Sequence, residues 1–152
     1  MENDRQSIRR LLWRWGAVTV FCAEQHREIE QYKDLINSTA GLRAINMDGM
    51  PHGNVVSRPT EQAAERIERL KQMYEERVEW ATEAIDKELR FEAALNDAMT
   101  CLNPTERAVI DLKYKRKYSL LRTARELHCA EPTVKYREKK AIDKLSKRIT
   151  VD

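Results

Sequence analysis

The chain has few of the residues that are typical of turns and sheets. Its 152 residues include only four glycines and four prolines, and aromatic side chains make up 7% of the sequence. A chain with so few turn-forming residues and with 35% charged residues favours long helices over sheets. We therefore expect an all-α fold.

Cysteine and histidine are also scarce. Cys22, Cys101 and Cys129 are odd in number and widely spaced, so they fit neither a disulfide framework nor a metal clip. The three histidines are equally scattered. No paired carboxylates stand in an apolar setting that would raise a pKa for acid–base work. We therefore expect no enzyme activity, no metal ion and no cofactor.

Long apolar runs are missing as well. The apolar stretch from Gly16 to Cys22 is short and is bounded by Arg14 and Glu24. Neither a secretory signal nor a bilayer crossing fits in so short a stretch. We expect a cytoplasmic protein that makes no membrane contact.

Charge is nearly balanced over the whole chain but not along it. The formal net charge is +3, while residues 1–50, 51–100 and 101–152 carry 0, −4 and +7. Attraction to phosphates depends on a local excess of positive charge more than on the total. The last third of the chain is therefore the part that is expected to meet nucleic acid.

Apolar residues at alternating spacings of three and four predict two long amphipathic helices. The first runs from about Arg5 to about Ile36, and the second from Thr60 to about Met99. A loop at 37–59, rich in Gly, Asn, Ser and Pro, would connect them. Each apolar stripe needs a partner, so we expect an antiparallel hairpin, and two hairpins can cover what one leaves open.

We assign this hairpin and oligomerisation region to residues 1–100 and a second domain to 101–152. In the second domain, the stretch from Ser119 onward reads as two short helices joined by a tight turn. Ser119 is a good N-cap, and Pro132 falls in the first turn of the second helix. The predicted apolar core of this helix-turn-helix consists of Leu120, Ala124, Leu127, Cys129 and Val134.

The second helix of a helix-turn-helix lies in the major groove of DNA. Glu131 and Thr133 are then placed to read bases, while lysines neutralise phosphates. A solvated basic helix packed on a bundle is the alternative interpretation of the same residues. The predicted DNA-binding residues are Arg122, Glu131, Thr133, Lys135, Tyr136, Lys139 and Lys140, with Lys115 and Arg116 from the end of the preceding helix.

The segment LNPTERAVIDLKYKRKYSLLRTARELHCAEPTVKYREKKAIDKL resembles region 4 of bacterial sigma-70 factors, which reads the −35 promoter element and contacts the flap of RNA polymerase. With its helical N-terminal part and the stretch GMPHGNVVSRPTEQAA, the whole chain resembles phage late-gene activators of the RinA and ArpU type. The resemblance implies a transcriptional regulator in a bacterial host cell. Its partners would be double-stranded DNA, host RNA polymerase and a second copy of the chain, since we favour a dimer.

Two positions depart from the sigma pattern. His128 stands where glycine is usual, so a left-handed backbone there would carry strain. Arg137 stands where an apolar residue is frequent. No segment resembles the sigma region that melts the −10 element, which favours an activator over a complete sigma factor. Two alternatives stay open: a DNA-packaging protein similar to small terminase subunits, and an interaction module that grips polymerase without touching DNA.

Overall fold

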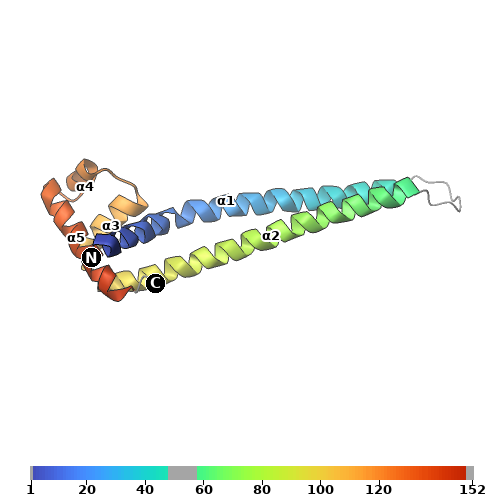
Figure 1. Cartoon of the computed structure of the whole chain (residues 1–152). Helices are drawn as coiled ribbons and strands as arrows, with labels where there is room; N and C mark the ends of the chain where they lie inside the picture. The colour runs from blue at the N-terminus through green and yellow to red at the C-terminus, as the bar shows by residue number, and fades with distance from the viewer. Residues whose placement is uncertain (1, 48–57, 150–152) are drawn as a thin grey trace. The chain divides into compact units, whose positions relative to one another are not determined.

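The computed structural model describes residues 2–47 and 58–149, which are helical apart from short connections. In chain order the helical elements are α1 (Glu2–Met47), α2 (Arg58–Ala98), η1 (Met99–Cys101), α3 (Pro104–Ile110), the π-helical turn η2 (Asp111–Lys115), α4 (Leu120–Glu126) and α5 (Glu131–Arg148) (Figure 1). No β-strand occurs within these described ranges. The all-α prediction is confirmed.

The described residues group into two compact units. One contains the chain up to Phe21 together with the chain from Lys87 onward, and the other contains the described residues between Cys22 and Asp86. Each of the two long helices therefore contributes to both units. The predicted domain boundary between residues 100 and 101 stays a prediction, but the contacts of the first unit extend across it.

In the second unit α1 and α2 run antiparallel. Ile29 of α1 packs against Ala81 and Ile85 of α2. Further along α1 the ring of Tyr32 lies 5.7 Å from that of Tyr74, so rising numbers on α1 meet falling numbers on α2. This is the helical hairpin that the two apolar stripes predict.

The predicted loop at 37–59 begins too early. Helix α1 continues through Met47, and α2 begins at Arg58. The hydroxyls of Ser38 and Thr39 donate to helix carbonyls four and three residues earlier, at 2.9 and 2.7 Å. These polar side chains suggested a loop, yet they are satisfied inside the helix. The remaining part of the predicted loop lies outside the described residues.

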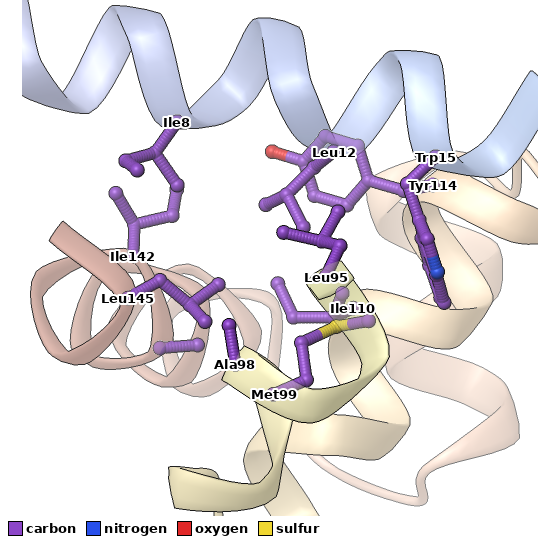
Figure 2. Close-up of a cluster of buried hydrophobic side chains, with 11 residues drawn as sticks. Ile8, Leu12, Trp15, Leu95, Ala98, Met99, Ile110, Tyr114, Ile142 and Leu145 are labelled. Atoms are coloured by element: carbon purple, nitrogen blue, oxygen red, sulfur yellow. The ribbon is translucent and has the colours of Figure 1, made fainter. Parts of the chain in front are cut away.

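The main apolar core lies in the first unit, where the start of α1 meets the end of α2, α3, η2 and α5. Ile8, Leu12 and Trp15 of α1 are fully buried there and point toward side chains of the other elements (Figure 2). Burial of one such side chain stabilises the fold by about 1.5–3 kcal/mol. The other buried members of this core are Leu95, Ala98, Met99, Ile110, Tyr114, Ala141, Ile142 and Leu145.

At Gly16 the backbone of α1 lies close to that of η2. A Cβ atom at this position would meet the Tyr114 carbonyl, with the carbonyl carbon only 2.7 Å away. Carbon atoms in ordinary contact are about 3.5–4.0 Å apart. Only glycine therefore lets the two backbones lie this close, and the trio Leu12, Trp15 and Gly16 fixes α1 against the turn.

Among the residues that the structure describes, no helix combines the length and the apolar character that a bilayer crossing requires.

Candidate nucleic-acid interface

Helix α4 begins where the sequence predicts. Ser119 has an extended backbone, and its Oγ accepts a hydrogen bond from the backbone N–H of Arg122 at 3.2 Å. The side chain thereby satisfies one of the donors that every helix start leaves without a partner. The cap fixes the residue at which α4 starts and so the position of the turn that follows.

The turn between α4 and α5 contains a left-handed residue. His128 has φ 51°, in the region that favours glycine. Its N–H donates to the carbonyl of Arg125 at 3.2 Å, and the N–H of Cys129 donates to the carbonyl of Ala124 at 3.0 Å. This pair of bonds is a Schellman motif, which ends a helix and satisfies its last carbonyls. The left-handed backbone expected at His128 is therefore present.

A small apolar core joins α4 to α5. Ala124 and Val134 are buried with Val109 of α3. The small side chain of Ala124 lets α4 lie close to α5, and Val109 connects the pair to α3. The structure brings together the whole set predicted for the helix-turn-helix core, since Leu120, Leu127 and Cys129 are partly buried against the same cluster.

A capping box ties the start of α3 to α5. The Asn103 side chain accepts from the backbone N–H of Glu106 at 2.9 Å, and Glu106 Oε2 accepts from the backbone N–H of Asn103 at 3.2 Å. The buried Glu106 carboxylate also accepts from Lys144 Nζ of α5 at 2.9 Å. A buried carboxylate requires such partners, because an unpaired buried charge is costly. The result is a second fixed contact along α5.

The second buried carboxylate, Glu138, belongs to α5 and is bound by side chains of η2. Glu138 Oε1 accepts from the Tyr114 hydroxyl at 2.8 Å, and Glu138 Oε2 accepts from Lys113 Nζ at 2.6 Å. Burial, together with the neighbouring Glu138 carboxylate, raises the pKa of Tyr114 well above its ordinary value of 10.0. These directional bonds fix the rotation of α5 about its axis and thereby determine which side chains face solvent.

The opposite side of α5 is open. Glu131, Lys135, Tyr136, Lys139 and Lys140 are all exposed, whereas the half-buried Thr133 lies at the edge of this face. Lys140 Nζ lies 5.3 Å from the centroid of the Tyr136 ring. Every predicted contact residue of α5 therefore lies on or beside one solvent-facing side.

The predicted DNA-binding residues outside α5 are exposed too, and two of them lie against aromatic rings. The guanidinium of Arg122 stacks on the ring of Tyr118 at 3.8 Å, next to the start of α4. Lys115 Nζ lies 4.7 Å from the centroid of the buried Trp15 ring, and Arg116 is exposed at the end of η2. Trp15 thus serves packing in the core and presents one ring face to a lysine.

The structure adds basic residues that the sequence reasoning did not select. A hollow of about 380 Å³ adjoins α5, and its lining includes Arg5 and Arg9 from α1. These two arginines lie four residues apart, so the sequence alone could show that they share one face of a helix. Nothing in the sequence indicates that this face lies beside α5, since the contact joins opposite ends of the chain.

Comparison with known proteins identifies a family for the C-terminal part of the chain. Residues 98–147 match the family model for sigma-70, region 4, which covers about a third of the chain and contains η1, α3, η2, α4 and most of α5. No curated protein matches the chain, and no solved structure matches it. The predicted resemblance to sigma region 4 is confirmed, and the C-terminal part of this chain is a DNA-binding helix-turn-helix similar to sigma-70 region 4.

Proposed function

We propose that this protein is a sequence-specific transcriptional regulator that inserts α5 into the major groove of double-stranded DNA. The observation that carries the proposal is the two-sided character of α5. Its inner side is fixed by Val134, Glu138 and Ile142, while its outer side presents lysines and Tyr136 to solvent. The match of residues 98–147 to sigma-70 region 4 supports the same orientation.

The finer role that we propose is activation of phage or prophage late genes, with contact to host RNA polymerase, in the cytoplasm of a bacterial cell. It rests on the resemblance of the whole chain to activators of the RinA and ArpU type. Such a regulator needs neither enzyme activity nor a cofactor. Its action depends on where it binds and which protein it brings there.

We further propose that the chain acts as a dimer through its N-terminal helices. Exposed apolar side chains on α2 support this part of the proposal, because Leu70, Met73 and Trp80 fall at helical spacings on one side of that helix. Native mass spectrometry gives the test. A dimer fits a regulator, whereas a ring of many subunits would favour the packaging alternative.

Reversing charge on α5 tests the DNA-binding part. We expect the double variant Lys135→Glu and Lys139→Glu to lose binding in a gel-shift assay at moderate salt, because two phosphate attractions become repulsions. The matched control is Lys147→Glu with Arg148→Glu, the same charge change in the last turn of α5. That control should keep most of the affinity.

If the Lys135 and Lys139 variant still binds DNA, α5 is not part of the DNA interface. Genome-wide footprinting of the intact protein then addresses the role in transcription. Occupied sites that abut promoters would support a regulator. Occupied sites confined to one packaging region would contradict it, and a polymerase pull-down without any footprint would favour the pure interaction module.

A further inference from the structure

We propose that the start of α1 is part of the DNA-binding surface, and that a backbone phosphate of the bound duplex lies in the hollow between α1, η2 and α5. This inference rests on the proposed function, because it takes α5 to be the helix that enters the groove. It assigns a role to Arg9, which belongs to the opposite end of the chain from the helix-turn-helix.

The hollow is strongly basic. Arg9 of α1, Lys113 of η2 and Lys135 and Lys139 of α5 line it together with Arg5, and Glu138 contributes the carboxylate of the lining. Cations that converge from three elements on a space of about 380 Å³ repel one another unless an anion lies between them. A phosphate oxygen is the anion that DNA supplies beside a groove.

Internal contacts already engage some of these groups. Lys113 Nζ donates to Glu138 at 2.6 Å, so the negative charge of Glu138 is already paired. Arg5 Nε donates to Asp143 at 2.8 Å. Both ion pairs hold the walls of the hollow in place, and they leave the attraction of a ligand to the remaining cations.

Arg9 is the cation of α1 that can turn to a ligand. Its guanidinium neighbours the uncharged hydroxyl of Tyr114. Its ion pair with Glu2 spans 3.9 Å, at the limit of a salt bridge, and the Glu2 side chain is 73% exposed. Such solvated pairs contribute little to stability, so a phosphate can replace Glu2 at little cost. The backbone beneath Arg9 is fixed, because Ile8 and Leu12 are buried on either side of it in sequence.

The position of the hollow matches the wall of a groove. Lys135 and Lys139 lie four residues apart on α5, so they stand one above the other on one flank of the helix. The major groove is about 12 Å wide, and an α-helix with its side chains measures about 10–12 Å across. The flanks of a docked α5 therefore meet the phosphates of the two strands, and Arg9 stands on the flank with Lys135 and Lys139.

Salt dependence of binding tests this inference on the intact chain. The probe is a fluorescein-labelled pool of random duplexes of about 30 base pairs, roughly three helical turns, followed by anisotropy between about 50 and 200 mM salt. Arg9→Ala removes the charge, and Arg9→Gln removes it while keeping a polar side chain of similar reach. Arg9→Lys keeps the charge. The matched control is Arg10→Ala, which removes the same charge from the neighbouring exposed residue outside the hollow.

We expect both neutral Arg9 variants to reduce the slope of log affinity against log salt by about 0.9, the value of one phosphate contact. Over a fourfold rise in salt, their affinity should then fall about 3.5-fold less than that of the parent chain. Arg9→Lys and Arg10→Ala should keep the parent slope. Far-ultraviolet circular dichroism on each variant checks that it is folded.

Equal slopes for Arg9→Gln and Arg10→Ala in folded protein would overturn the inference. The Lys135 and Lys139 charge-reversal variant separates the two proposals in the same assay. If it loses binding while Arg9 has no effect, α5 meets DNA without α1, and the proposed function stands. If it binds like the parent chain, the proposed function fails at its first step.

Discussion

Replacing Gly16 with alanine should destabilise the first compact unit, although the same change would strengthen an isolated helix. The added Cβ would meet the carbonyl of Tyr114, and its distance from the carbonyl carbon would be 2.7 Å. Both partners are backbone, so no side chain can rotate away. Helix α1 would have to move back by about 1 Å to reach an ordinary contact distance, and the packing of Leu12 and Trp15 would loosen with it.

The magnitude follows from two opposing effects. Overpacking of this kind costs about 1–3 kcal/mol or somewhat more, while alanine gains about 1 kcal/mol over glycine in a helix interior. Because both clashing groups are backbone, we take the cost at the upper end of this range, about 3 kcal/mol. The expected net loss is then about 2 kcal/mol, or a fall in Tm of about 4–8 °C for a chain of this size. Gly41 provides the matched control, because a Cβ there meets nothing within 4 Å. Gly41→Ala should raise stability by about 0.5–1 kcal/mol.

A urea titration followed by far-ultraviolet circular dichroism measures both variants against the parent chain. The difference between Gly16→Ala and Gly41→Ala removes the common effect of helix propensity. If the two variants are equally stable, α1 does not lie against the backbone of η2. The core in Figure 2 would then be incorrectly assembled on the α1 side.

Two further predictions concern the turn and the buried tyrosine. His128→Gly should raise the free energy of unfolding by about 0.5–1 kcal/mol in a urea titration. The left-handed backbone costs a residue with a Cβ about 1–2 kcal/mol, and glycine gives back part of this gain because it makes the unfolded chain more flexible. A loss of stability would contradict the φ of 51°. Because the pKa of Tyr114 is raised in the folded state, its contribution to stability is fully present below the unfolded pKa of about 10 and is lost as the pH rises above it. Tyr114→Phe should weaken this alkaline loss in thermal unfolding scans at increasing pH, and an unchanged pH profile would contradict the buried hydroxyl.

The parts of the fold that follow from local rules could be predicted from the sequence. Ser119 and Asn103 are caps because their side chains are short acceptors placed directly before apolar periodic stretches. His128 was recognisable as a candidate left-handed position only through the resemblance to sigma region 4, in which glycine is usual at that position, and its φ is 51°. Local chemistry misled at residues 37–47 for the opposite reason, since small polar side chains suit both a loop and the exposed face of a helix.

The exposed face of α5 could also be predicted from the sequence, whereas the basic hollow beside it could not. Lys135 and Lys139 were selected because they lie along the outer face of the predicted second helix, where lysines can neutralise phosphates. Arg9 has the same spacing relation to Arg5, but the role that we propose for it depends on a contact between residues more than a hundred positions apart. The burial of Glu138 follows from its spacing of four residues from both Val134 and Ile142 on the apolar face of α5. Its partners Lys113 and Tyr114 belong to η2, and no local pattern indicates them.

The contacts of the first unit also explain why the helix-turn-helix packs against the start of α1 and the end of α2. A segment of about 50 residues buries too little apolar surface to be more than marginally stable. In this chain the inner side of α5, at Ile142 and Leu145, is covered by Ile8 and Leu12 of α1 and by the end of α2. The residues that hold α5 are thus carried by the same two helices that form the hairpin in the second unit. Any partner that shifts the start of α1 will therefore change the support of α5 and, with it, the position of the exposed lysines on the outer side of α5.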